Sequence, residues 1–465
     1  SYVSGSIEGE GGSSLLKDDP ELFGYLDYKA SSATQTVNGS KSISANESYF
    51  GRLGYNFKDK YIAQVQLRAD AFDLSKLPVT NRWGYFPSVS LAWVATKENF
   101  LSNVPVLSYL KIRASWGVNG SIAALSNYPY STSITSSSAY SWDLVQSTGT
   151  ANWVVAKFPS SLGNDELSWE TTTQTNVGFD ARFLRDKLSL SADYFNKQTE
   201  DLLVSGITPS YIIGGTASPL NAGSVLNRGF EFEGGYRDKI GQFSYSVNAN
   251  LSTLHNEVTY LHPALTYIAG ASLHLDRITI FEEGAEVWHF WGYEYQGVDE
   301  ATGVAIIKDQ LTVDTDGDGI PDAGDGIITQ DDKVNIGSGI PDFTYGITLN
   351  MAYRGIDFLL FGTGSQGNDI FMGLTKIDRM QGNRVYENFY EGRWIAGADN
   401  SKATIPAASS DLTYYMYSDA MVKDGSFFKI KQIQLGYTIP ESITKKAMVS
   451  NLRLYVSLDD FFTFT

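Results

Sequence analysis

Apolar and polar residues alternate along many short segments of this chain. In the segment 188–194, Leu188, Leu190 and Tyr194 occupy alternate positions, and polar residues such as Ser189 lie between them. A period of two places the apolar side chains on one face of a β-strand and the polar side chains on the other. This alternation predicts twelve strands, at 49–57, 61–70, 85–94, 109–117, 169–183, 188–197, 228–237, 242–252, 343–353, 356–365, 426–438 and 451–461.

The connections between these strands alternate between short and long. The long connections are predicted at 71–84, 118–168, 198–227, 253–342 and 366–425. Structureless loops of this length are unusual in a compact soluble domain, although the alternation itself also occurs in ordinary antiparallel sheets. Strands of about ten residues, with tight turns at one end and long loops at the other, are typical of an outer-membrane barrel. The predicted fold class is therefore all-β, an antiparallel transmembrane β-barrel with its long loops on the extracellular side.

Composition supports this class and excludes others. The 465 residues include 44 glycines and 13% aromatic residues, which suit the turns, bulges and interfacial aromatic girdles of such barrels. No apolar run approaches the eighteen or so residues of a membrane-spanning helix, and the absence of cysteine excludes a disulfide framework or a thiol metal site. The net charge of −17 argues against nucleic acid as a partner.

The ends of the sequence suggest a part of a larger barrel. The chain begins at Ser1 without a signal peptide and stops directly after a strand that runs toward the loop side. We expect residues 1–48 to be the remnant of an extracellular loop that leads into the barrel. Residues 49–465 would then form about twelve strands, and at least one more strand would be needed to close the sheet.

An acidic loop follows the spacing of a calcium-binding loop. Oxygen ligands fall at the first, third, fifth, seventh, ninth and twelfth positions, with Gly319 at the sixth. The expected ligands are Asp314, Asp316, Asp318, the backbone carbonyl of Ile320, Asp322 and Asp325. Carboxylates clustered in this way repel one another without a counter-ion. We expect a structural Ca²⁺ in the longest loop; the alternative is a solvated loop tip that binds no metal.

A second candidate site is aromatic and polar. The outer loops contain many aromatic residues, among them Trp142, Trp153, Trp288, Trp291 and Tyr390. Such rings stack on sugars or on the apolar parts of peptides, but they also pack loops together or against a lid protein. The expected ligand-contacting residues are Asn368, Asp369, Arg379, Arg384, Tyr386 and Trp394.

Catalysis has little support in the sequence. All four histidines lie in the connection 253–342, without a metal-ligand spacing, and no Gly-x-Ser-x-Gly motif occurs. We therefore expect that the chain is not an enzyme. The alternation also assigns the two faces of the predicted barrel: Leu190, Val247 and Leu349 would face lipid, and the lumen would be lined by Gln64, Gln66, Arg68, Ser189, Ser191, Asn248 and Asn250. A lumen of this kind suits neutral polar cargo.

Several longer motifs occur in a fixed order along the chain. They lie at 81–93 (NRWGYFPSVSLAW), 110–120 (LKIRASWGVNG), 167–178, 193–203, 227–231, 291–295, 341–346, 366–370 and 458–465. In sequence and in order they resemble the SusC-like (RagA-like) TonB-dependent transporters of the Bacteroidetes outer membrane. The resemblance covers nearly the whole chain beyond residue 46.

The resemblance implies a barrel of twenty-two strands that is plugged by an N-terminal domain, with this chain as its C-terminal half and the plug and last strand absent. It implies active import of an oligosaccharide or peptide across the outer membrane. The implied partners are a SusD-like surface lipoprotein, the TonB complex acting through the absent N-terminal part, and the lipid bilayer; a homodimer of the complex is compatible with the resemblance. A non-transporting surface-binding or secretion-linked barrel component is the alternative function.

Overall fold

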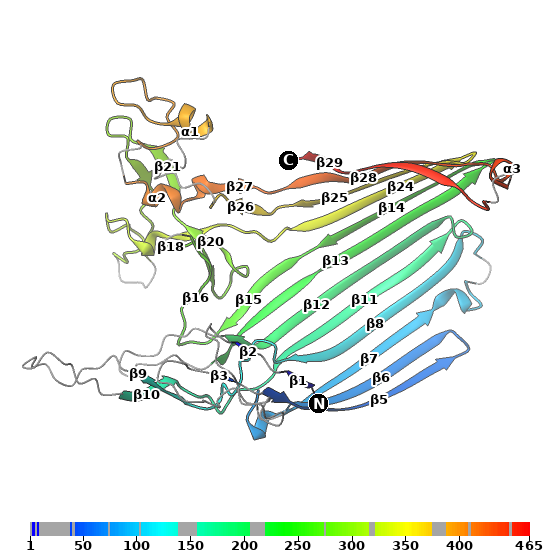
Figure 1. Cartoon of the computed structure of the whole chain (residues 1–465), viewed down its shortest axis with the longest axis horizontal. Coiled ribbons are helices and arrows are strands. Elements are labelled where there is room, and N and C mark those ends of the chain that lie inside the picture. Colours follow the sequence, from blue (N-terminus) through cyan, green and yellow to red (C-terminus); the bar gives the residue numbers. More distant parts are fainter. Residues whose placement is uncertain are drawn as a thin grey trace, which may run out of the picture.

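The computed structural model describes residues 2–4, 7–8, 38–39, 42–72, 75–101, 104–137, 156–204, 219–273, 276–315, 321–373, 387–407, 411–445 and 449–465. These residues form one large curved antiparallel sheet, with smaller sheets gathered at one end of its strands (Figure 1). The tight turns lie at the opposite end (Figure 1).

The large sheet has thirteen strands, and twelve of them follow one another in chain order. These twelve are β5 (Asn46–Phe57), β6 (Tyr61–Phe72), β7 (Trp83–Val94), β8 (Leu107–Ser121), β11 (Glu170–Phe183), β12 (Leu188–Val204), β13 (Leu220–Ile240), β14 (Phe243–Thr253), β24 (Phe343–Tyr353), β25 (Ile356–Gln366), β28 (Phe427–Thr438) and β29 (Arg453–Phe464). The remaining strand, β15 (His255–Leu261), pairs with β13. All twelve predicted strands are confirmed. β5 and β29 form the two edges of the sheet, and they do not pair with each other in the described part of the chain.

Some strands run further than the alternation predicts. β12 and β13 both extend into the connection predicted at 198–227, and β8 extends into the one predicted at 118–168. In β12 the register shifts between Thr199 and Leu202, and Asp201 between them has φ of +57°. An irregularity of this kind moves the following side chains to the other face while strand pairing continues. The period of two therefore breaks before the strand ends.

The two faces of the sheet differ in polarity. One row of paired residues crosses all twelve strands and contains only aromatic, aliphatic or glycine residues: Phe57, Tyr61, Trp93, Ile112, Phe179, Ala192, Phe232, Leu251, Tyr345, Gly364, Phe428 and Phe464. Leu190, Val247 and Leu349 lie in neighbouring rows on the same face, and the residues predicted for the lumen lie on the opposite face. Many apolar side chains on this face are exposed, up to 74% for Leu53. A sheet face that is both apolar and exposed fits contact with lipid.

The long connections contain secondary structure of their own. A four-stranded sheet joins β16 (Ile268–Ala269), β19 (Thr279–Phe281), β20 (His289–Gly292) and β23 (Val334–Gly337). Two-stranded pairs are formed by β1 (Tyr2–Ser4) with β4 (Ser42–Ser44), β2 (Ile7–Glu8) with β3 (Asn38–Gly39), β9 (Ser133–Ser137) with β10 (Ala156–Ser161), β17 (Ser272–Leu273) with β18 (Asp276–Arg277), β21 (Tyr295–Val298) with β22 (Ala305–Ile307), and β26 (Asp369–Phe371) with β27 (Val422–Asp424). The helices are α1 (Glu387–Gly392), α2 (Thr413–Met416) and α3 (Glu441–Thr444), with 3-10 turns η1 (Val79–Asn81), η2 (Ala95–Lys97), η3 (Gln330–Asp332) and η4 (Asp419–Met421).

Buried apolar clusters lie at the loop end of the sheet. The three clusters consist of Leu77, Phe86, Ile122, Leu125, Leu167, Trp169 and Leu203; of Val225, Val258, Leu261 and Phe281; and of Ile405, Tyr415 and Met421. The first two hold long connections against the ends of the strands, and the third packs the connections 253–342 and 366–425 against each other. Among the described residues, no helix combines the length and the apolar character that crossing a membrane requires.

Candidate functional site

A network of charged side chains lies on the polar face of the sheet. Arg113 on β8 is 3.1 Å from the Oδ1 atom of Asp180 on β11 and 2.7 Å from the Oδ2 atom of Asp193 on β12. The same guanidinium donates to the Ser191 hydroxyl at 3.1 Å. These residues come together because the register places their positions side by side on three adjacent strands. The network fixes their side chains along the wall that would line the lumen.

The same wall carries carboxylates that have no cation beside them. The register places Glu231 of β13 beside Asp193, and Glu233 beside Ser191. Both glutamates are exposed, and neither forms an ion pair within the described ranges. This part of the wall is therefore polar and acidic, which suits water and polar groups rather than apolar cargo.

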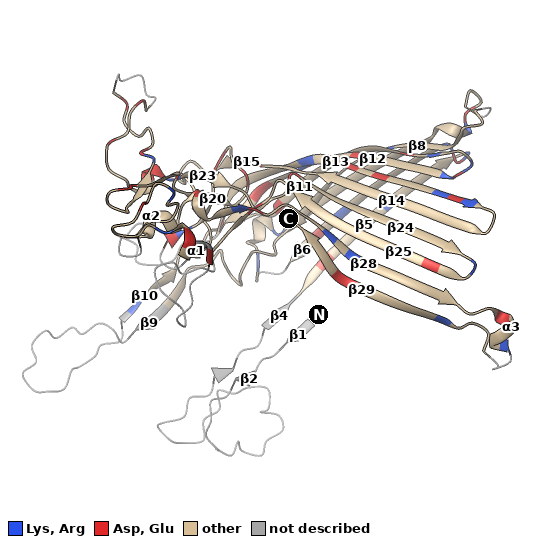
Figure 2. Ribbon diagram, turned by 90° about the horizontal axis from the view of Figure 1, so that it is seen from above, with Lys and Arg blue, Asp and Glu red and all other residues tan. Residues whose placement is uncertain are grey.

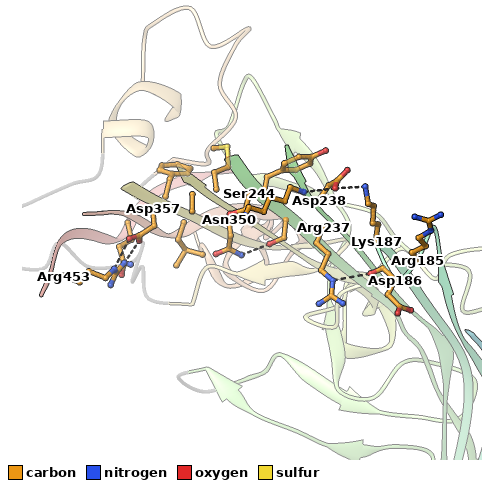
Figure 3. A pocket seen from close by; sticks show the side chains of 17 residues that line it. Arg185, Asp186, Lys187, Arg237, Asp238, Ser244, Asn350, Asp357 and Arg453 are labelled. Carbon is orange, nitrogen blue, oxygen red and sulfur yellow. Dashed lines mark hydrogen bonds and ion pairs between the residues drawn. The ribbon is translucent and has the colours of Figure 1, made fainter. Parts of the chain in front are cut away.

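A hollow of about 650 Å³ lies at the tight-turn end of the sheet (Figure 3). Its lining contains five cationic and three acidic residues, together with polar and apolar ones. The cations are Arg185, Lys187, Arg237, Lys239 and Arg453, and the carboxylates are Asp186, Asp238 and Asp357. Two ion pairs cross it: Lys187 with Asp238 at 2.7 Å, and Arg453 with Asp357. The lining contains neither a histidine nor a metal-ligand cluster. The hollow can hold water and charged groups.

Elsewhere, charged residues are most frequent in the described loops and near the turns, and long stretches of the strands contain none (Figure 2). The hollow was not predicted from the sequence because its lining comes from several strands that are distant along the chain. The only signal in the sequence was the basic character of the short connections, where Arg185 and Lys187 lie.

Two long connections, 253–342 and 366–425, are joined into one loop body. The backbone N–H of Tyr293 donates to the carbonyl of Tyr417 at 2.9 Å, and Tyr293 forms an isolated bridge with Ser418. Burial and the nearby Asp276 carboxylate raise the pKa of Tyr293. Burial alone raises the pKa of Tyr415 to about 12. These tyrosines are part of the packing between the two connections.

A buried lysine lies at the centre of this loop body. The Lys333 side chain is 0% exposed, and its Nζ atom is 2.6 Å from the Oδ2 atom of Asp276. The same ammonium lies over the rings of Trp291, Tyr293 and Tyr417, with distances to the ring centres of 4.6, 5.3 and 5.7 Å. A desolvated cation over aromatic faces is stabilised by their quadrupoles. This cage connects β18, β20 and the segment that precedes η4.

Half of the predicted ligand-contacting residues are described, and they serve the packing of the loops. Asn368 accepts a hydrogen bond from Ser365 at 2.9 Å and donates to the carbonyl of Gly425 at 3.2 Å. Asp369 accepts from the backbone N–H of Ser338 at 3.2 Å, and the indole of Trp394 donates to the carbonyl of Glu300 at 2.8 Å. Arg379, Arg384 and Tyr386 lie outside the described residues. The ligand role of these six residues stays a prediction.

The two sides of the predicted calcium loop are joined by a bridge between Val313 and Ala323. Asp322 accepts hydrogen bonds from the backbone N–H and the hydroxyl of Thr315, and these bonds lower the pKa of its carboxyl group. Asp325 accepts from the N–H of Ile327 at 2.8 Å, and the ligand positions Asp316, Asp318 and Ile320 lie outside the described residues. The part of the chain that the structure describes has no group of three or more metal-ligating side chains. The calcium site also stays a prediction.

A family model described as "TonB dependent receptor-like, beta-barrel" matches residues 9–458 of this chain. The chain belongs to this family. Its members are outer-membrane receptors and transporters rather than enzymes, so the predicted fold class, the outer-membrane location and the expectation of a non-enzyme are confirmed.

Individual relatives confirm the resemblance to SusC-like and RagA-like receptors. TonB-dependent receptor P3 of Formosa agariphila is 33% identical over 440 residues, which cover 92% of this chain and 42% of that receptor. TonB-dependent receptor SusC of Bacteroides thetaiotaomicron is 29% identical over 401 residues, which cover 84% of this chain and 37% of SusC. The structure of the RagAB peptide transporter has the same fold, with a TM-score of 0.76 at 21% identity over 94% of this chain and 46% of that one. The chain spans less than half the length of each of these relatives.

Proposed function

We propose that this chain is part of a barrel that imports an oligomeric nutrient across the outer membrane, powered by the TonB complex. The family match over residues 9–458 carries the proposal. The polar wall supports it, because a lumen lined by Arg113, Asp180, Asp193 and their neighbours suits a hydrated, polar cargo. The cargo that we propose is a glycan or an oligopeptide.

We also propose that a SusD-type surface lipoprotein covers the loop end of the parent barrel. Two similarities support this partner: one relative is named SusC, and one structural match is titled a RagAB peptide transporter. The joined loop body, held by Lys333 and by the Tyr293–Tyr417 hydrogen bond, offers a rigid surface at that end. TonB coupling would depend on parts of the parent protein beyond this chain.

The test uses the full-length parent, the protein of which this chain would be a part. It is purified from its native outer membrane in mild detergent, and every associated component is identified by mass spectrometry. We expect a lipoprotein lid at a fixed ratio to the barrel, an N-terminal plug in the barrel chain, and trapped oligosaccharide or peptide. The mass of the particle would also show whether two complexes associate. A barrel without a plug, with an unrelated surface partner, would support a non-transporting surface component instead.

Removal of calcium is expected to loosen the loop between Val313 and Ala323. If Ca²⁺ holds the acidic side chains together, chelation leaves them to repel one another, and proteases should cleave the loop faster. Asp318→Asn should have the same effect without chelator. Asp331→Asn is the matched control, because it makes the same charge change in the same connection outside the proposed ligand set. Cleavage that is unchanged by chelator would remove the support for calcium.

A further inference from the structure

Trp288 has a backbone conformation that large residues rarely adopt. Its φ is +58°, in the left-handed region that favours glycine and asparagine. It immediately precedes β20, in the turn where the N–H of His289 donates to the carbonyl of Glu286. Residues held in such conformations cluster at binding and active sites. The conformation of Trp288 therefore suggests a role in binding, in addition to its place in the turn.

The surroundings of Trp288 cover only part of its ring. The ring lies 5.5 Å from that of Phe281, which is buried in an apolar cluster. Gly270 provides room for it, because a Cβ atom there would lie 2.8 Å from the Cε3 atom of Trp288. The residue nevertheless remains 44% exposed. The indole ring of Trp288 thus packs against Phe281 and Gly270 on one side, and part of it is exposed to solvent.

A cation lies on the same small stretch of backbone. The Nη1 atom of Arg277 donates to the carbonyl of Gly270 at 3.1 Å, so the guanidinium and the indole both flank Gly270. Arg277 is exposed and forms no ion pair among the described residues. A guanidinium has five N–H donors in a planar fork that matches a carboxylate. Its other donors are therefore suited to a ligand.

Tyr390, another exposed aromatic residue, differs from Trp288 in having a cation stacked on its ring. The guanidinium of Arg393 lies 3.9 Å from the ring centre of Tyr390, so the cation covers that ring. The corresponding stacking is absent between Arg277 and Trp288 in the described residues. Ring and cation therefore remain separately accessible beside Gly270.

We propose that Trp288 and Arg277 form a binding subsite for an acidic oligomer, with a ring stacked on the indole and a carboxylate on the guanidinium. The proposal rests on the proposed import function and narrows its cargo class. A chain with a net charge of −17 repels anions in bulk, so a local cation must select them. The carboxylate belongs either to a uronic acid sugar or to a peptide.

The test uses the full-length parent with its associated partners. Binding is measured by calorimetry for trigalacturonate against its methyl ester, and for an aromatic tripeptide with a free C-terminus against its amide. We expect one acid to bind at least tenfold better than its neutral counterpart. Arg277→Gln should remove that preference, lowering affinity for the acid roughly 10- to 100-fold, and Trp288→Asn should lower it roughly tenfold.

A structural control separates binding from packing. Asparagine tolerates positive φ, so Trp288→Asn should leave hydrogen exchange of β19 and β20 unchanged or slower. Faster exchange together with weaker binding would mean that Trp288 only packs the loop, and this would overturn the proposal. Tyr390→Asn is the matched aromatic control and should leave binding unchanged.

Uptake by cells separates this proposal from the import function. If the wild-type parent imports oligomers but neither substitution changes acid binding or uptake, the subsite is wrong and the import function stands. If neither acid binds better than its neutral counterpart, the subsite is also wrong. If the wild-type parent imports no oligomer of any class, the import function fails and the proposed cargo selection fails with it.

Discussion

Leu349→Arg is expected to block assembly of the barrel, whereas Asn350→Arg, one position along the same strand, is expected to be tolerated. Leu349 lies in an apolar row between Val247 of β14 and Leu360 of β25. An arginine facing lipid near the middle of the bilayer costs about 2–4 kcal/mol. Asn350 instead lines the hollow of about 650 Å³, which has room for the longer, polar side chain of an arginine.

The measurement is the fraction of each variant that reaches the outer membrane as folded, heat-modifiable barrel in gel electrophoresis. Two further pairs repeat the comparison on other strands: Val247→Arg with Asn248→Arg, and Leu190→Arg with Ser189→Arg. In each pair the first residue lies on the apolar face and the second on the polar face. Equal assembly within all three pairs would show that the two faces are not divided between lipid and lumen.

Asp276→Ala is expected to disrupt the joined loop body without unfolding the barrel. The substitution leaves the ammonium of Lys333 buried without its carboxylate, and removal of one partner from a buried pair costs about 3–5 kcal/mol. Lys333→Met removes the charge but keeps an apolar side chain among the rings, so its effect should be smaller. Hydrogen exchange of β20 and of the segment near Tyr417 would measure the loss.

An exposed ion pair in the same loop body serves as the control. Glu294 and Lys308 are 2.6 Å apart, and both side chains are more than one-third exposed. Exposed pairs contribute at most about 1 kcal/mol, so Glu294→Ala should change exchange little. If Asp276→Ala has no greater effect than Glu294→Ala, the buried Asp276–Lys333 pair does not stabilise the joined loop body.

The strands could be predicted from the sequence because contact with lipid imposes a rule at every second position. The row from Phe57 to Phe464 contains no polar residue over twelve strands, so the alternation persists across the whole sheet. The rule fails where hydrogen bonding continues after the register shifts, as it does at Asp201. Strands β16 and β19 are only two and three residues long, which is too short for an alternation of apolar and polar residues to be recognised.

The candidate site was predicted only in part, for a different reason. The polar character of the wall follows from single strands, and residues such as Ser191 and Asn250 were assigned correctly to its face. The partners of Arg113 depend on the register of three strands, and the Lys333 cage joins positions from 276 to 417. Contacts over such sequence distances leave no local pattern. The hydrogen bonds of Asn368 to Gly425 and of Trp394 to Glu300 are long-range as well, so the sequence could not reveal them.

The most direct test of the central proposal is uptake by cells that carry the full-length parent, with and without a functional inner-membrane TonB complex. The cells receive a mixture of labelled oligosaccharides and oligopeptides, and label inside the outer membrane is measured after washing. We predict uptake that requires both the parent and the TonB complex. Label that stays on the surface, in equal amounts with and without the TonB complex, would contradict import and identify a surface-binding component.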